Sequence, residues 1–131
     1  MRVLVVDDDP NFIEAITASF GADQRLEVVG AASNGQEAVD QAAALRPEVV
    51  AMDISMPILD GVEATKMILS ADARCRVVLV SGSMFQERNE QGSEVALNAG
   101  ASGYVAKARA ALDLADAIVA AAEGQARPSV S

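Results

Sequence analysis

Residues 49–61 read VVAMDISMPILDG, and this stretch decides the fold. Four consecutive apolar residues precede Asp53, and a loop that contains a proline and a glycine follows it. So short an apolar run is typical of a strand buried on both faces, as in a parallel sheet covered by helices. In such proteins ligands and chemistry collect at the carboxyl ends of the strands. The stretch therefore predicts a strand that ends at Asp53, although taken alone it fits an ordinary solvated loop aspartate equally well.

Short apolar runs alternate with helix-patterned segments along the rest of the chain. The strands that we expect are 3–6, 26–32, 49–52, 76–80 and 103–106. A first helix should begin at Pro10, with Asp9 as its N-cap, and end at Gly21. The other expected helices lie between the turn at 33–35 and Pro47, over 62–69, over 93–98 and over 110–123.

Five strand–helix units joined by short connections predict a single α/β domain with a parallel sheet and helices on both faces. Right-handed crossovers leave few topologies, and the commonest at this length is the flavodoxin-like (βα)5 fold, a doubly wound sheet of strand order 2-1-3-4-5. We expect this domain to occupy residues 1–124. Residues 125–131 are expected to form a C-terminal tail or the start of a linker.

Composition excludes several functional classes. The net charge is −9, so this chain is not expected to contact DNA by itself, because a duplex would repel it. It has no histidine, so any phosphohistidine chemistry must draw on another protein. Its one cysteine, Cys75, excludes an internal disulfide and is interpreted as a small core residue rather than a redox centre. No apolar window approaches the roughly 18 residues of a membrane helix, and we expect a cytoplasmic protein.

Polar side chains follow four of the predicted strands: Asp7 and Asp8, Asp53, Ser81, and Lys107. Each alone fits a loop acid, a turn residue or a solvated lysine. In strand order 2-1-3-4-5, however, the three carboxylates should lie together, and such a cluster is unfavourable without a cation. Magnesium is the natural occupant because it prefers oxygen ligands. Carboxylate, cation, hydroxyl and amine are the groups that phosphoryl transfer to an aspartate requires.

In this order the residues resemble the receiver domain of the response regulators of two-component signalling. The motifs that carry the resemblance are 5–9, 52–57 with Asp60-Gly61, 80–82 and 99–107, and together they cover essentially the whole chain. The resemblance implies that Asp53 accepts a phosphoryl group from the phosphohistidine of a sensor histidine kinase or phosphotransfer protein.

The same resemblance implies a ligand set for Mg²⁺ (or Mn²⁺). Asp8, Asp53 and the backbone carbonyl of Ser55 would bind the cation directly, and Asp7 would act mainly through a metal-bound water.

Three further roles are implied by the resemblance. Lys107 would pair with the acidic cluster and then with the phosphoryl group. Ser81 would move to bind a phosphoryl oxygen, and Tyr104 would swing inward behind it. The surface formed by the fourth helix, the fifth strand and the fifth helix would change shape, and phosphorylation could produce a homodimer.

The chain departs from the common receiver pattern in two places. Ala108 follows Lys107 where many receivers have a proline in a cis peptide, so we expect the bend there to have a trans bond or to be built differently. This lysine without a following proline resembles the NarL/LuxR-type subfamily. Residues 124–131 resemble the linker of that subfamily, which leads to a DNA-binding domain that regulates transcription. A freestanding receiver that acts by protein–protein interaction is the alternative. The segment 81–100 is also longer than is usual for receivers.

Two other classes fit parts of the pattern. A magnesium-dependent phosphohydrolase would use Asp53 as a covalent nucleophile, but Ser55 is a poor general acid or base, so only slow self-dephosphorylation is expected and we predict a signalling module rather than an enzyme. A flavin-binding protein would need small or hydroxylated residues after the first strand. The aspartates at 7–9 would repel a phosphate there.

Overall fold

The computed structural model describes residues 1–54, 56, 58–82 and 98–124. Five parallel strands form one sheet in the order β2-β1-β3-β4-β5, which confirms the predicted flavodoxin-like fold and strand order. The strands are β1 (Arg2–Val6), β2 (Glu27–Ala32), β3 (Val49–Asp53), β4 (Arg76–Ser81) and β5 (Gly103–Ala106).

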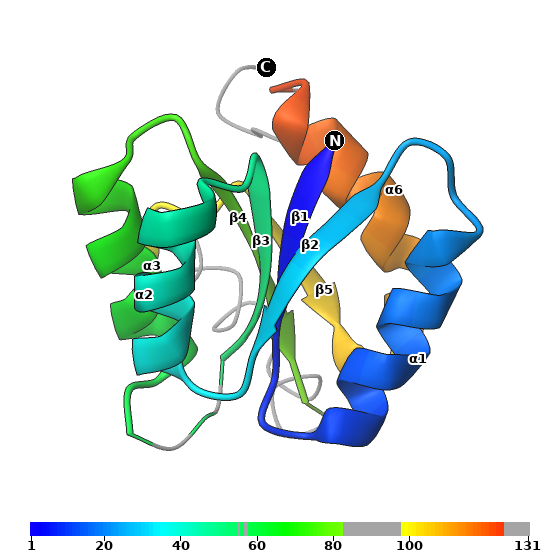
Figure 1. Cartoon of the computed structure of the whole chain (residues 1–131), viewed down its shortest axis with the longest axis horizontal. Helices are drawn as coiled ribbons and strands as arrows, with labels where there is room; N and C mark the ends of the chain where they lie inside the picture. Colours follow the sequence, from blue (N-terminus) through cyan, green and yellow to red (C-terminus); the bar gives the residue numbers. More distant parts are fainter. Residues whose placement is uncertain (55, 57, 83–97, 125–131) are drawn as a thin grey trace.

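Helices cover both faces of the sheet (Figure 1). On one face lie α2 (Gly35–Leu45) and α3 (Gly61–Ala71), and on the other lie α1 (Pro10–Gly21) and α6 (Ala110–Ala122). A short 3-10 turn, Lys107–Arg109, joins β5 to α6. No peptide bond among the described residues is cis, so the bond after Lys107 is trans, as expected. Residues 83–97 and 125–131, and with them most of the predicted helix at 93–98, lie outside the described part of the chain.

Two apolar layers hold the sheet between the helices. Alternate residues of β1 point to opposite faces: Val3 and Val5 pack towards α1 and α6, whereas Leu4 and Val6 pack towards α2 and α3. The central strands are buried on both faces, which explains why they are continuous apolar runs rather than alternating ones. Among the described residues Phe20 is the largest fully buried side chain, and nearly all the other core residues there are aliphatic.

Side-chain caps start three helices beside the carboxyl edge of the sheet. The carboxylate of Asp9 accepts a hydrogen bond from the Asn11 amide at 2.9 Å, and this bond begins α1. The side chains of Asn34 and Asp60 cap α2 and α3 in the same way. A cap of this kind stabilises a helix by about 1 kcal/mol. Each of these helices therefore begins at a capped residue on the side of the sheet where β1, β2 and β3 end.

Close packing at Gly61 fixes the corner between β3 and α3. A Cβ atom at this position would collide with the backbone carbonyl of Asp53. The Gly61 amide donates a hydrogen bond to the Ile54 carbonyl at 2.8 Å, which holds the backbone in this close approach. Gly61 therefore sets the conformation of the strand end that carries Asp53.

Substitution of Gly61 by alanine should consequently lower the free energy of unfolding by about 2–4 kcal/mol, because the Asp53 backbone must move to admit a methyl group. Urea denaturation measures the change. Gly21→Ala is the matched control: an added Cβ there meets open space at the end of α1, so the change should stay within about 1 kcal/mol and be stabilising. Equal stability of the two variants would contradict the close approach.

Candidate functional site

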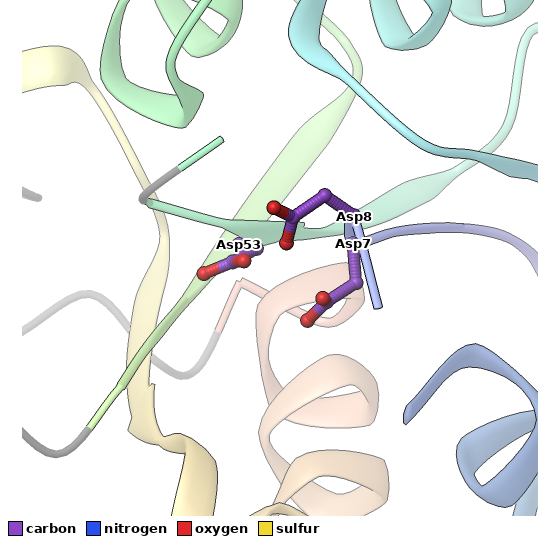
Figure 2. Close-up of side chains that lie close together, drawn as sticks. All are labelled: Asp7, Asp8 and Asp53. Atoms are coloured by element: carbon purple, nitrogen blue, oxygen red, sulfur yellow. The ribbon is translucent and has the colours of Figure 1, made fainter. Parts of the chain in front are cut away.

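Three aspartates meet at the carboxyl edge of the sheet. Asp7 and Asp8 follow β1, and Asp53 ends β3, the strand that pairs with β1. One carboxylate oxygen from each lies within 4.8 Å of the others, and Figure 2 shows the three side chains gathered at these strand ends. Asp7 is fully buried and Asp53 is 5% exposed, whereas Asp8 is open to solvent. The structure thus brings together the three carboxylates that the sequence singled out.

Lys107 is the cation that reaches this cluster. Its Nζ lies 2.9 Å from Oδ2 and 3.2 Å from Oδ1 of Asp7, with hydrogen-bond geometry only to Oδ1. Oδ1 also accepts a hydrogen bond from the Asp9 amide at 2.8 Å. The buried Oδ2 makes no hydrogen bond within the described chain, so it keeps the capacity to accept one from a further donor.

Burial and the surrounding charges shift the pKa values of both members of this pair. Desolvation raises the pKa of Asp7 above its usual value, because the opposing hydrogen bonds from Lys107 and the Asp9 amide only partly compensate for lost water. Burial also lowers the pKa of Lys107, but its hydrogen bond to Asp7 and the charges of Asp7, Asp53 and Asp9 outweigh that effect and raise it. Lys107 is therefore a cation, and the cluster retains excess negative charge.

An aromatic ring positions Lys107 as well. Its Nζ lies 4.7 Å from the centre of the Phe12 ring, which belongs to the first turn of α1. A cation–π contact of this kind is worth about 0.5–2 kcal/mol. Sequence reasoning placed Phe12 only in the apolar face of the helix. No sequence signal could have found this contact, because the two residues lie far apart along the chain.

A second polar contact joins β4 to β5. Ser81 Oγ and the Tyr104 hydroxyl lie 2.8 Å apart. Ser81 is fully buried, whereas Tyr104 is partly buried and packs against the apolar layer under α2 and α3. The Tyr104 hydroxyl is thus directed at the end of the strand next to β3. Ser55 lies outside the described residues, so its predicted part in metal binding stays a prediction.

The donor set of the aspartate cluster fits a hard divalent cation. It offers only carboxylate oxygens, and one of them, Oδ2 of Asp7, is buried without a hydrogen-bond partner among the described residues. Mg²⁺ typically binds one or two carboxylates, a carbonyl and several waters. Asp7, Asp8 and Asp53 could therefore hold such an ion.

Comparison with protein families agrees with this geometry. The family model for the response regulator receiver domain matches residues 3–119. The chain belongs to this family. Such domains bind Mg²⁺ at an acidic pocket, and the aspartate cluster is the corresponding feature here.

Curated relatives carry enzyme names. A protein-glutamate methylesterase/protein-glutamine glutaminase of Pseudomonas putida is 41% identical over 110 residues, which are 82% of this chain and 28% of that protein. A protein of the same name from Nocardioides is 40% identical over 82% of this chain and 29% of its own length. The chain thus spans less than a third of the length of these relatives, and matches only their receiver part.

Solved receiver structures share the fold. The response regulator domain of Thermotoga maritima CheB has a TM-score of 0.83 and 34% identity, over 94% of this chain and 96% of that one. The receiver domain of the putative regulator NarL from Mycobacterium tuberculosis has a TM-score of 0.84 and 28% identity over the same shares. In the described part of the chain, no helix is both long and apolar enough to cross a membrane.

Cys75 lies away from the aspartates, in the apolar layer under α2 and α3. Its side chain is 3% exposed, and burial raises the pKa of the thiol to about 11. At pH 8 only about a thousandth of the thiol is ionised, and the thiolate is the reactive form. The structure supports its interpretation as a core residue.

The native protein should consequently react with the uncharged thiol reagent 4,4′-dithiodipyridine at pH 8 at least about a hundredfold more slowly than the protein unfolded in guanidinium chloride. Absorbance of the released thiopyridone measures both rates, and free cysteine provides the reference. A native rate close to that of free cysteine would mean that Cys75 is accessible and activated.

Proposed function

We propose that this receiver domain is a phosphorylation switch in which Asp53 accepts a phosphoryl group from a histidine kinase or phosphotransfer protein. The convergence of Asp7, Asp8 and Asp53 with Lys107 at one edge of the sheet carries this proposal. An Asp53 carboxylate oxygen attacks phosphorus, the bond from phosphorus to the donor's imidazole nitrogen breaks, and the imidazole keeps the electron pair. No proton acceptor is needed on this chain, which suits a protein without histidine.

The aspartates and the Ser55 carbonyl have separate tasks in this proposal. Asp8, Asp53 and the Ser55 carbonyl would hold Mg²⁺ (or Mn²⁺), and Asp7, whose buried Oδ2 has no hydrogen-bond partner among the described residues, would act mainly through a metal-bound water. Bound there, the ion offsets negative charge on the phosphoryl oxygens. Lys107, already cationic and held by Asp7 and Phe12, turns from the cluster towards the phosphoryl group.

Reversal of the modification is expected to be slow. Hydrolysis of an aspartyl phosphate needs a group that activates water, and the position two residues after Asp53 is a serine. This supports a signalling module over the alternative of a phosphohydrolase, which would turn over small phosphoesters.

The Ser81–Tyr104 contact supplies a means of switching. When Asp53 is phosphorylated, the Ser81 hydroxyl donates to a phosphoryl oxygen instead of remaining with Tyr104. Tyr104 then repacks behind Ser81, and the surface formed by β5 and α6 with the fourth helix changes. That surface is the proposed site of output and of a homodimer formed on phosphorylation.

The relatives that the chain matches suggest which output domain a longer parent protein would carry. The sequence of the tail predicted a DNA-binding output domain and transcription regulation, but the methylesterase relatives do not support that output. The 41% identity to methylesterases favours a methylesterase-type output instead, and we propose this as the leading possibility for a longer parent protein. A freestanding receiver in the cytoplasm is the second. The reading frame beyond Ser131 distinguishes these cases.

Incubation with acetyl phosphate and Mg²⁺ should label the parent protein with one phosphoryl group, and Asp53→Asn should abolish labelling because the amide is not a nucleophile. Intact-protein mass spectrometry measures the added mass. Asp40→Asn is the matched control, since this exposed aspartate lies on α2 and should leave labelling unchanged. Labelling of the Asp53→Asn protein at the parental level would refute the assignment.

Addition of Mg²⁺ at about ten times its dissociation constant should stabilise the fold by about 1.4 kcal/mol, or about 3–6 °C in thermal midpoint for a domain of this size. Asp8→Asn should remove this increment, even if the variant starts more stable because repulsion among the carboxylates falls. Differential scanning fluorimetry with and without Mg²⁺ compares the increments, with Asp40→Asn again as control. If Mg²⁺ stabilises the Asp8→Asn protein as much as it stabilises the parent, the ion binds at another site.

A further inference from the structure

A cleft that the proposed switch does not use lies at the amino-terminal ends of the strands, opposite the carboxyl ends that carry the aspartates. Its volume is about 610 Å³, and it lies where α2 and α3 lead into β3 and β4. These connections run along the edge of the sheet where the N-terminus begins β1, far from the loops that carry the aspartates (Figure 1). Val39 and Ala42 of α2 and Ile68 of α3 form apolar parts of its lining. Small-molecule sites typically occupy about 300–1,000 Å³.

Three arginines line this cleft: Arg46, Arg74 and Arg76. Within the described part of the chain, none of their guanidinium groups forms an ion pair or a hydrogen bond. Arg76 Nε is buried and has no hydrogen-bond partner among the described residues. Leaving a buried donor unpaired is costly, more so when the group is charged. The cleft is therefore lined by three arginines whose guanidinium groups have no partner among the described residues.

Acidic neighbours do not neutralise the cleft. Glu48 and Asp72 are the two acids in its lining, against three arginines, so the lining carries a net charge of +1 on a chain of net charge −9. Both carboxylates are engaged with backbone amides: Glu48 accepts from the Arg2 amide at 3.0 Å, and Asp72 accepts from the Arg74 amide at 3.0 Å. The guanidinium groups thus remain available for a ligand.

The backbone conformation of Arg46, one of the lining residues, is held by the fold. Its φ of 49° lies in the left-handed region, which costs a residue with a Cβ about 1 kcal/mol or more. Two hydrogen bonds hold it there: its amide donates to the Ala42 carbonyl at 2.9 Å, and its carbonyl accepts from Arg2 Nη1 at 2.9 Å. The position from which the Arg46 side chain extends is therefore set before any ligand arrives.

From these observations we infer that the cleft between α2 and α3 binds a small organic anion, with a phosphate or carboxylate group held by Arg46, Arg74 and Arg76. Guanidinium groups bind both kinds of oxyanion through paired hydrogen bonds. The apolar side chains of Val39, Ala42 and Ile68 contact the body of the ligand. Arg76 begins β4 and Ser81 ends it, so the strand's length separates this site from the aspartates.

Titration of the ¹⁵N-labelled chain followed by amide NMR tests the inference. The probes are adenosine 5′-monophosphate and citrate, added in EDTA so that no divalent cation can retain them at the aspartates. We expect saturable shifts at residues 42–48 and 72–76 with at least one probe. The probe that binds tells whether phosphate or carboxylate is preferred.

Arg74→Gln and Arg76→Gln should each weaken that binding at least fivefold, and Arg74, being exposed, can be changed without disturbing the core. Arg25→Gln is the matched control, because this arginine pairs with Asp23 and Asp116 away from the cleft and should leave the affinity unchanged. The inference is overturned if neither probe gives saturable shifts at these residues, or if Arg74→Gln binds like the parent.

Discussion

Repulsion among the carboxylates of Asp7, Asp8 and Asp53 is the constraint on which the rest of the site depends. The order of the sheet places the ends of β1 and β3 side by side, so the charges cannot separate without disrupting the core. Lys107 offsets part of the charge through Asp7, and burial still raises the pKa of that acid. A cluster in this state favours any ligand that adds positive charge, which is the property that a metal-dependent phosphoacceptor needs.

Elements that are distant in the sequence hold Lys107 beside the aspartate cluster. The lysine follows β5, its acidic partner follows β1, and the ring beneath its ammonium group belongs to α1. Ser81 and Tyr104 link β4 to β5 just beside it. Side chains from several strands therefore meet at this edge of the sheet, as the proposed switch requires.

The two edges of the sheet differ in charge as well as in chemistry. Acids gather at the carboxyl edge, whereas arginines gather where α2 and α3 lead into β3 and β4. Between them the central strands are aliphatic and buried on both faces. The receiver domains of CheB and of the putative regulator NarL share this fold.

The sequence by itself determined the five strands, their order and the convergence of the three aspartates, because apolar period and strand ends are local patterns and parallel topology has few solutions. The observed bounds of the described strands and helices differ from the predicted ones by only a residue or two. The strand expected at 26–32, for example, begins at Glu27. Tertiary structure alone decided the ring of Phe12 under Lys107, the Ser81–Tyr104 bond and the arginine cleft. Each of these features brings together side chains that lie far apart along the chain. A local sequence pattern does not predict which distant side chains will come into contact.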